Sequence, residues 1–527
     1  MSGGPRSGRR EPGATPGKAG VGSGSAGRQG AAGGTARRRG GAPGGKGAAP
    51  GAGPGRGPGA SAPRARQPRS ARELALDALV RVSRDGAYSN LQLNAALQES
   101  GLSRADAGLA TELVYGTLQR RLTLDHWLQQ FITKGFAKLE PWVLSLLRMS
   151  LYQLVYLDRV PAHAAVNEAV NIGRRRGHAG ISSMLNGVLR NAVRQLPQLK
   201  AETFAGETNE VRRLSLRHSY PEWLVGRWIS AYGVETAEAM MESGNEPPHS
   251  SLRINRLRTS PEQALLQLQQ AGLNARLSDA APWAGVVVAR GGNLAGTDGY
   301  TEGLWSIQDE SSMIVAAAAD PRPGFRVLDC CAAPGGKSAH MAELMEGKGE
   351  IIANDLHPHK QALVESQAAR LGLSNIQAVS GDAAELAEHF ALASFDLVLL
   401  DAPCSGLGVI RRKPEIKWTK TPDDIEAIAA IQERLLDSAS CLVKPGGTLL
   451  YSTCTIAEEE NGKQIADFLA KHPDFSLDPE GWPAEVLEPL RSAGVESASA
   501  DHFDGALQLL PQHFGSDGFY IARLKRI

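Results

Sequence analysis

The sequence predicts a multidomain chain in which an all-α domain precedes an α/β domain with a mostly parallel sheet. Apolar residues recur at helix spacing from residue 71 to about residue 196, whereas strand-like and helix-like stretches alternate from about residue 301 onward. A third observation concerns function: the strand at residues 326–329 is followed at once by a glycine-rich turn. Open α/β sheets bind their ligands at such strand-to-helix turns, so we expect the site there.

Composition bounds the class of protein. The chain has 527 residues, 42% of them hydrophobic and 21% charged, which is enough for about three domains with buried cores. A net charge of +1 indicates no particular partner, and five cysteines without metal-ligand spacing predict neither a disulfide framework nor a metal site. We find no apolar run of 18 residues and no signal-peptide pattern, so we expect no membrane partner and a cytoplasmic location. The sequence leaves the oligomeric state open.

Residues 1–70 consist mainly of Gly, Ala, Pro, Ser and Arg. Glu11 is the only carboxylate before Glu73, and the first aromatic residue is Tyr88. Such a segment cannot bury enough apolar surface to offset its chain entropy, so we expect a disordered basic tail. It is either a loose, salt-sensitive tether for nucleic acid or a dispensable extension, and the sequence does not choose between them.

Residues 71–200 are predicted to form an all-helical domain. Ser103 and Asp106 have the spacing of a capping box, and Pro141 fits the first turn of a later helix. Two further helices are expected at residues 164–172 and 182–193. The first of these helices ends with Arg174, Arg175 and Arg176, just before Gly177. These cations either stabilise the C-terminus of their helix or contact phosphate, and the rest of the chain favours the second interpretation.

Three motifs of the helical domain carry a family resemblance. They are ELVYGTL at residues 112–118, AVNEAV at 165–170 and LNGVLRN at 185–191. In this order they resemble the NusB family of RNA-binding transcription antitermination factors. The resemblance implies that the helical domain binds or positions RNA and has no catalytic role.

A helical connector, residues 201–250, and a small α+β subdomain, residues 251–300, are predicted next. The subdomain combines strands at 252–257 and 286–289 with a helix at 261–271. Arg253, Asn255 and Arg258 lie in the region of its first strand. They predict a basic outer face suited to a nucleic-acid backbone, although an ordinary solvated face is the commoner explanation. The subdomain is therefore assigned an RNA-positioning role.

The α/β domain, residues 301–527, is predicted to contain a largely parallel, doubly wound sheet. Its helix at 422–442 begins with Thr421 as cap and carries Asp423 and Asp424 in the first turn, where the helix dipole favours them. The predicted strands are residues 326–329, 350–354, 376–379, 395–400, 448–451 and 518–524.

Polar residues and cysteines follow the strands of this sheet. Asp355 comes about twenty residues after the glycine-rich turn, as a carboxylate that binds ribose hydroxyls should. The turn is not G-x-G-x-x-G, so a nicotinamide or flavin dinucleotide is not expected. The other strand ends carry Asp329-Cys330-Cys331, Gly381-Asp382, Asp401-Ala402-Pro403-Cys404 and Ser452-Thr453-Cys454. Cysteines at several strand ends of one sheet are more than isolated core residues.

A thiol beside an acid and a nucleotide-like cofactor suits one kind of chemistry. A thiolate can add to carbon 6 of a pyrimidine, which makes carbon 5 nucleophilic enough to accept a methyl group. An acid near N3 and the exocyclic amine stabilises the charge that the addition creates, and a base then removes the carbon-5 proton. The residues alone do not decide between Cys404 and Cys454, because DNA cytosine methyltransferases use the cysteine of a Pro-Cys pair.

Four motifs of the α/β region carry a second resemblance. They are GLWSIQDESS at residues 303–312, CAAPGGK at 331–337, DAPCSGLGVIRRKPEIKW at 401–418 and YSTCT at 451–455. Together they resemble the NOL1/NOP2/Sun family of RNA cytosine-5 methyltransferases over residues 251–527. The resemblance implies a Rossmann-like domain that depends on S-adenosyl-L-methionine.

The resemblance also implies a role for each matching residue. Cys454 is the nucleophile, Cys404 assists release of the product, and Asp401 lies beside both cofactor and target base. Asp355 binds the cofactor ribose and Asp382 lies by its adenine. Arg411, Arg412 and Lys413 follow the Asp401 loop, and we expect them to hold RNA phosphates. The residues that wrap the cofactor are Cys331, Ala332, Ala333, Pro334, Gly335, Gly336 and Lys337.

A NusB-like domain joined to this catalytic domain narrows the expected function. The resemblance then implies methylation of carbon 5 of a cytosine in small-subunit (16S) ribosomal RNA through a covalent cysteine adduct, with the base extruded if it lies in a helix. Two alternatives remain open. One is the same chemistry on transfer RNA or on another ribosomal site, and the other is a non-catalytic RNA-binding assembly or antitermination factor.

Overall fold

The structure is a computed structural model that describes residues 70–86, 88–289, 292–495 and 503–527. The predicted basic tail lies outside these residues, except for Ser70. Residues 67–527 belong to one compact unit, so the predicted domain boundaries at 200, 250 and 300 stay predictions. Within the described ranges, no helix combines the length and the apolar character needed to cross a membrane.

The N-terminal part of the described chain is all-helical, as predicted. Ser70 and Ser103 accept backbone amides as the caps of α1 and α3, and Pro141 occupies the first turn of α5. Helix α5 is buried along most of its length among its neighbours. The helices are α1 (Ala71–Asp85), α2 (Ser89–Ser100), α3 (Arg104–Gln119), α4 (Arg121–Phe131), α5 (Pro141–Tyr156), α6 (Ala162–Arg176), α7 (Ala179–Arg194), α8 (Leu196–Ala201), α9 (Glu210–His218) and α10 (Glu222–Asn245).

The arginines that close α6 are partly engaged inside the protein. Arg175 and Arg176 form ion pairs of 3.0 Å and 2.7 Å with Glu73 and Asp77 of α1. Arg174 is exposed. The predicted helix C-terminus is confirmed, but two of its three cations serve to join α6 to α1.

A small antiparallel sheet follows the helices, with strand order β2-β3-β1-β4. The predicted strand–helix–strand unit is present as β1, α11 and β3. Strands β2 and β4 were not predicted, because three residues are too few for a visible period. The elements are β1 (Ser250–Ile254), α11 (Pro261–Gln270), β2 (Ala275–Leu277), β3 (Gly285–Val288), α12 (Asp298–Thr301) and β4 (Trp305–Ile307).

The basic outer face predicted for β1 is wrong at two of its three residues. Arg253 is 1% exposed and donates to both carboxylate oxygens of Glu343, at 2.7 Å and 3.0 Å. Asn255 is also buried and donates to the carbonyl oxygen of Gly303. The α/β region covers this face of the strand, and a buried arginine needs an acidic partner.

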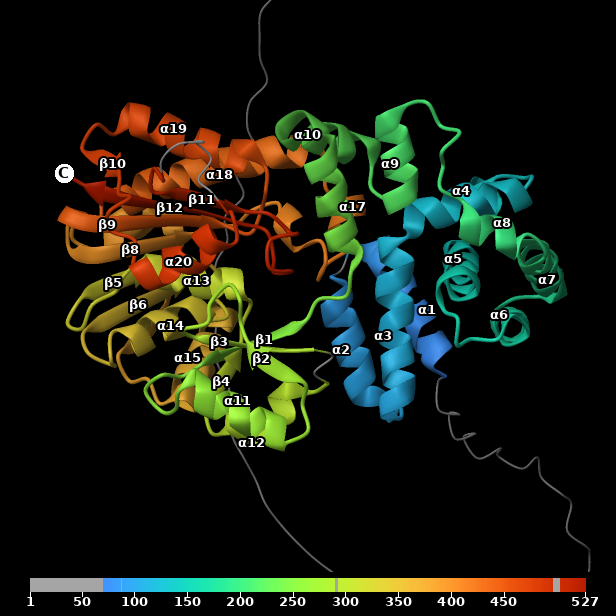
Figure 1. Cartoon of the computed structure of the whole chain (residues 1–527), viewed down its shortest axis with the longest axis horizontal. Helices are drawn as coiled ribbons and strands as arrows, with labels where there is room; N and C mark the ends of the chain where they lie inside the picture. The colour runs from blue at the N-terminus through green and yellow to red at the C-terminus, as the bar shows by residue number, and fades with distance from the viewer. Residues whose placement is uncertain (1–69, 87, 290–291, 496–502) are drawn as a thin grey trace, which may run out of the picture. The chain divides into compact units, whose positions relative to one another are not determined.

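The large sheet contains eight described strands in the order β10-β12-β9-β8-β5-β6-β7, with β11 paired to β12. Strands β9, β8, β5, β6 and β7 are parallel neighbours, and β12 joins β9 antiparallel, which confirms the mostly parallel sheet (Figure 1). The strands are β5 (Arg326–Asp329), β6 (Glu350–Asp355), β7 (Ile376–Ser380), β8 (Phe395–Asp401), β9 (Val443–Thr453), β10 (Phe475–Leu477), β11 (Ala506–Leu509) and β12 (Phe519–Arg526). Their helices are α13 (Glu310–Ala318), α14 (Gly336–Leu344), α15 (Pro358–Leu371), α16 (Leu386–His389), α17 (Ile416–Thr419), α18 (Pro422–Ser440), α19 (Gly462–Lys471) and α20 (Ala484–Ser492).

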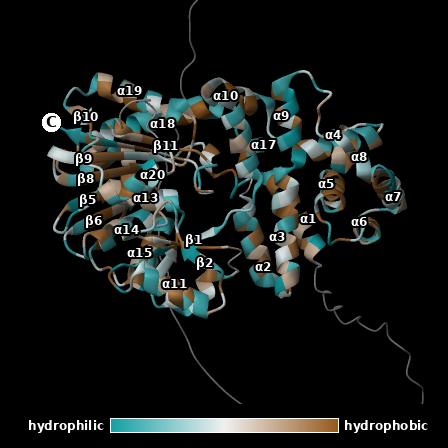
Figure 2. Cartoon of the chain, viewed as in Figure 1, coloured by the Kyte–Doolittle hydropathy of each residue, from teal (hydrophilic) through white to brown (hydrophobic). Residues whose placement is uncertain are grey.

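Both faces of this sheet are buried. Leu397 and Leu399 of β8 pack in a cluster with residues of α13, α14 and α20, whereas Val398 and Leu400 pack with residues of α18 and α19. Burial on both faces explains why the middle of β8, residues 397–400, is a continuous apolar run; Figure 2 shows hydrophobic strands in this sheet.

The order of the strands fixes where a ligand can bind. From β5 the chain moves to β6 and β7 on one side, and then returns to β8 and β9 on the other side. The crevice outside such a reversal point is the ligand site of doubly wound sheets. The turn after β5 and the loop after β8 flank this crevice.

Candidate functional site

A cavity of about 760 Å³ lies at the carboxyl ends of the parallel strands, and most of the predicted site residues line it. A volume of this size suits a small-molecule ligand together with part of a second one. Ala332, Pro334, Gly335, Gly336 and Lys337 belong to the turn after β5 without contributing to the cavity wall. The predicted residues in the wall are Cys331, Ala333, Asp355, Asp382, Asp401, Cys404 and Cys454.

The glycine-rich turn is held from two sides. Gly335 has φ +99°, and a Cβ there would lie 3.1 Å from the Cα of Val364 in α15. Arg253 of β1 donates to the carbonyl oxygen of Gly336 at 2.7 Å while it pairs with Glu343 of α14. The small sheet therefore braces the turn, a role that no sequence pattern predicts.

The carboxylates at the strand ends fit a nucleoside cofactor with a positive charge. Asp355 accepts the backbone amide of His357 and pairs with Lys360, and Asp382 accepts the amide of Ala384 at 2.9 Å. Both line the cavity, where hydroxyl and amine donors could reach them. Asp329 is buried, and its Oδ1 has no hydrogen-bond partner among the described residues. The acceptors Asp355 and Asp382 in this wall fit the hydroxyl and amine groups of S-adenosyl-L-methionine.

Asp329, at the end of β5, is a buried acid that the sequence did not assign to a task. Burial raises the pKa of its carboxyl to about 7, with the nearby Asp401 charge adding to the effect. Ser338 donates a hydrogen bond of 2.6 Å to its other oxygen. With this pKa, the carboxyl group of Asp329 can bind or release a proton near neutral pH, next to the glycine-rich turn.

The two predicted thiols lie against each other. Cys404 follows β8 and Cys454 follows β9, and their Sγ atoms are 3.2 Å apart. The parallel register of the two strands pairs Asp401 with Ser452, and the Ser452 hydroxyl donates to Asp401 Oδ1 at 2.8 Å. Residues 50 positions apart in the chain are therefore brought together by the pairing of neighbouring strands.

The surroundings of the thiol pair are not symmetric. The hydrogen bond from Cys404 lowers the pKa of Cys454, and the ammonium groups of Lys337 and Lys413 lower it further against burial and Asp401. The same hydrogen bond, burial and the Glu460 charge raise the pKa of Cys404. These two shifts favour Cys454 as the thiolate of the pair and Cys404 as its hydrogen-bond donor.

Lys337 and Asp401 form an ion pair at the back of the site. Lys337 Nζ lies 2.8 Å from Asp401 Oδ2. Burial acts to lower the pKa of Lys337, but the neighbouring Asp401 carboxylate outweighs it and leaves the pKa raised. The pair fixes the carboxylate of Asp401 from one side while Ser452 holds it from the other.

A buried carboxylate connects the two cysteine loops. Glu460 accepts the backbone amide and the hydroxyl of Ser405, and also the hydroxyl of Thr455 at 3.3 Å. Gln432 of α18 donates to the same carboxylate at 3.0 Å. Each bonded loop residue directly follows a cysteine, so Glu460 sets the spacing of the pair. The sequence signal for it was the polar run at residues 458–461 soon after Cys454.

The predicted phosphate-binding arginines have other partners. Arg411 is buried and donates to the carbonyl oxygens of Ser243 and Pro511, and Arg412 pairs with Asp309 and Asp517. The prediction is wrong for these two residues, because segments about 100 and 170 positions away use their guanidinium groups. Lys413 lines the cavity and forms no ion pair with a described residue.

The segment after Lys413 meets the helical part of the chain. Glu415 accepts the backbone amide of Ser89 at 2.9 Å and its hydroxyl at 2.7 Å, which caps the start of α2. Lys417 is 1% exposed and donates to the carbonyl oxygens of Gln119 and Ser219. The motif that supplies Asp401 and Cys404 therefore also docks the helices.

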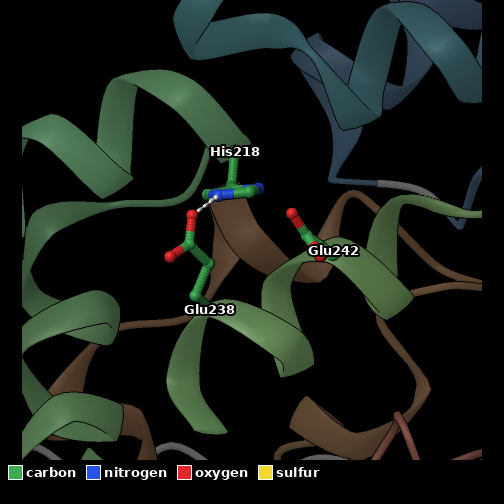
Figure 3. A group of neighbouring side chains, drawn as sticks. All are labelled: His218, Glu238 and Glu242. Atoms are coloured by element: carbon green, nitrogen blue, oxygen red, sulfur yellow. Dashed lines mark hydrogen bonds and ion pairs between the residues drawn. The ribbon is translucent and has the colours of Figure 1, made fainter. Parts of the chain in front are cut away.

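The described residues contain one group with metal-ligand spacing, His218, Glu238 and Glu242, whose ligand atoms lie within 4.8 Å of one another. In Figure 3 a dashed line joins His218 to Glu238 only, at 3.1 Å. Arg217 already supplies a cation to Glu238 at 2.9 Å. The hydrogen bond and the ion pair engage His218 and Glu238 within the protein.

Three family models match the chain in succession. The NusB family matches residues 69–194, and the ferredoxin-like domain of RsmF/B-like methyltransferases matches residues 220–294. The model described as 16S rRNA methyltransferase RsmB/F matches residues 316–525. The matches follow the observed order of helices, small sheet and large sheet.

Curated relatives and solved structures agree with these models. The probable ribosomal RNA small subunit methyltransferase B of Bacillus subtilis (strain 168) is 45% identical over 460 residues, covering 87% of this chain and 99% of the relative. The ribosomal RNA small subunit methyltransferase B of Pseudomonas putida is 35% identical over 450 residues, with 85% and 97% covered.

Among solved structures, the crystal structure of PH0851 has a TM-score of 0.70 at 27% identity, covering 86% of this chain and 98% of that one. A methyltransferase homolog protein from Pyrococcus horikoshii has a TM-score of 0.52 at 30% identity, with 61% and 100% covered. The chain therefore belongs to the ribosomal RNA small subunit methyltransferase B family.

Proposed function

We propose that this protein transfers a methyl group from S-adenosyl-L-methionine to carbon 5 of a cytosine in small-subunit ribosomal RNA. The names of its relatives support the substrate class. The main support for methylation at carbon 5 is one observation: two thiols lie in contact beside a carboxylate in one cavity. A methyltransferase acting on an exocyclic nitrogen or a ribose oxygen has no need of a thiolate.

Cys454 starts the reaction in this proposal. Its thiolate forms a bond to carbon 6 of the cytosine, and the electron pair of the C5–C6 double bond moves into the ring toward carbon 5 and N3. Asp401, held by Lys337 and Ser452, lies beside the thiols and accepts a hydrogen bond from the exocyclic amine, which orients the ring. The ammonium group of Lys337 offsets the negative charge that develops toward N3. When bound, S-adenosyl-L-methionine supplies the methyl group that carbon 5 accepts.

Release of the product needs the second thiol. After methylation, carbon 5 carries both the methyl group and its original proton. A base removes that proton, the double bond re-forms, and the bond between carbon 6 and Cys454 breaks to return the thiolate. Cys404, whose Sγ lies 3.2 Å from that of Cys454, assists this step.

The cofactor residues in the proposal are those predicted from the motifs. Asp355 would hold the ribose hydroxyls, Asp382 the adenine, and the turn from Cys331 to Lys337 the methionine part. The fit of the carboxylate-lined cavity to a hydroxyl-bearing cation supports this assignment.

The experiment combines the purified full chain, cofactor labelled in its methyl group, and small-subunit ribosomal RNA from cells that lack the gene. We expect label in 5-methylcytosine after digestion to nucleosides, and transfer RNA in a parallel reaction to remain unlabelled. Label on a purine or a ribose would contradict the proposed chemistry. Label confined to transfer RNA would contradict the proposed substrate while leaving the chemistry intact.

A further inference from the structure

An aromatic ring from the helical part of the chain reaches the cavity of the site. Tyr88 precedes α2, is 50% exposed, and lines the same cavity as Cys404 and Cys454. Lys413 Nζ lies 5.0 Å from the centroid of its ring. The proposed reaction uses neither the ring nor its hydroxyl.

The chain directly after this ring is anchored to the site. Ser89 is 0% exposed and is bonded twice to the buried carboxylate of Glu415. Glu415 in turn belongs to the segment that follows the Cys404 loop. The two hydrogen bonds therefore tie the residue next to Tyr88 to the segment that carries Cys404.

The cavity wall holds carboxylates and also three cations that have no acidic partner among the described residues. Lys413, Lys420 and Arg434 line the cavity, and none of them forms an ion pair with a described residue. Lys413 is close enough to Cys454 to lower the pKa of its thiol. An exposed aromatic face among unpaired cations is the arrangement that binds single-stranded nucleic acid, by base stacking and phosphate contact.

We propose that Tyr88 and Lys413 form a subsite for the nucleotide next to the target cytosine, with its base stacked on Tyr88 and its phosphate on Lys413. The inference rests on the proposed function, since it needs a cytosine at Cys454. It gives the helical part of the chain a direct task in substrate choice: to hold the neighbour of the methylated base.

The test uses the full chain as wild type, Tyr88→Ala, Tyr88→Phe and the control Leu91→Ala. Leu91 is 61% exposed in α2 and does not line the cavity. The substrate is ribosomal RNA into which a synthetic segment has been ligated, with an abasic nucleotide on the 5′ or the 3′ side of the mapped cytosine. Initial rates give kcat and KM for each pair of enzyme and RNA.

We expect Tyr88→Ala to raise KM for intact RNA by roughly 5- to 100-fold, the range for one stacked base, with little change in kcat. Tyr88→Phe restores the low KM because it keeps the ring, and Leu91→Ala behaves as wild type. On one side of the cytosine, the abasic nucleotide should raise the KM of the wild type by a similar factor. It should not raise the KM of Tyr88→Ala further, because that variant already lacks the stacking partner.

The subsite would be overturned if the increases in KM caused by Tyr88→Ala and by the abasic nucleotide multiplied, whichever side of the cytosine the abasic nucleotide was on. A KM for Tyr88→Ala equal to that of Leu91→Ala would also overturn it. Binding of S-adenosyl-L-methionine at the wild-type Kd shows that each variant is folded, and Tyr88→Leu replaces Tyr88→Ala if the latter is not. A wild type that methylates no cytosine would instead contradict the proposed function, so the two failures are distinguishable.

Discussion

The Sγ atoms of Cys404 and Cys454 lie 3.2 Å apart although the two residues belong to different strand ends. Two thiols this close share a proton once one of them is ionised, and the charges around them favour one sulfur as the thiolate. Lys337 and Lys413 act on Cys454, whereas Glu460 acts on Cys404. These surroundings support the proposed division into a nucleophile, Cys454, and a proton donor, Cys404.

Replacement of each cysteine should have a different result. Cys454→Ala removes the attacking sulfur, so we expect no turnover and no covalent complex with RNA. Cys404→Ala leaves the attack intact but slows release, so we expect protein trapped on RNA as a band that survives a denaturing gel. Cys441→Ala is the matched control, since Cys441 is exposed and lies outside the cavity wall. If the two variants exchanged behaviours, the roles would be reversed.

The lowered pKa of Cys454 predicts a distinct reactivity toward alkylating agents. The rate of carboxymethylation at Cys454 should reach half its maximum at a lower pH than for an ordinary thiol, because only the thiolate reacts. Cys404→Ala removes the hydrogen bond that stabilises this thiolate and should move the midpoint to higher pH. Mass spectrometry of peptides alkylated at a series of pH values gives both profiles. Equal midpoints in the two proteins would contradict the assignment.

Asp401→Asn tests the acid of the site. The substitution keeps the hydrogen bond from Ser452 but removes the charge that pairs with Lys337. We expect kcat to fall by about 10²- to 10³-fold, as when a preorganised electrostatic group is removed, with RNA affinity almost unchanged. Single-turnover rates at saturating RNA measure the effect. Asp474→Asn, which removes a surface ion pair with Arg526, should leave kcat at the wild-type value.

Asp329 should make stability depend on pH in an unusual direction. Burial raises its pKa from 3.8 to about 7, so between these values the folded chain binds more protons than the unfolded chain. The free energy of unfolding therefore falls as pH rises through this window, by about 4 kcal/mol in all, and is constant above it. Asp329→Asn is isosteric, accepts from Ser338 and does not titrate. Urea unfolding at pH 5 and pH 8 should show a smaller difference for this variant than for wild type.

Much of the large sheet was predictable because its strands are apolar runs that end at polar residues. Cys404 and Cys454 could be placed at one edge, since parallel strands have their carboxyl ends together. Strands β10 and β11 were missed, being only three and four residues long. Strands this short show no recognisable alternation of polar and apolar residues. They form because each pairs antiparallel with β12.

Contacts between distant segments were not predictable. Arg411 and Arg412 adjoin the site in the chain, and nothing local reveals that Asp309, Asp517 and the end of α10 engage them. In the same way, the 326 positions between Ser89 and Glu415 conceal a buried pair of hydrogen bonds. A sequence displays charge, but the partner of a charge is set by the packing of whole elements.

Lys417 is the strongest case of such a hidden partner, and it supplies the last prediction. Its ammonium is buried between α17 and the helical part of the chain. There it lies 3.5 Å from the centroid of the Tyr220 ring and donates to Asn245 at 2.8 Å, as well as to two carbonyl oxygens. Burial lowers its pKa, and the three acceptors together with the aromatic face compensate for the lost water.

Lys417→Met keeps the volume of the side chain but leaves those three acceptors without a donor. Each buried acceptor left unpaired costs about 1–3 kcal/mol, so we expect a large fall in the free energy of unfolding. Amide hydrogen exchange should quicken at the contact between α3 and α17, where the Trp418 indole donates to the Leu118 carbonyl. Lys134→Met, at an exposed lysine, is the control. Because Glu415 and Tyr88 depend on the same contact, Lys417→Met should also raise KM for RNA. An unchanged KM in a destabilised variant would mean that the docked helices do not help to hold the substrate.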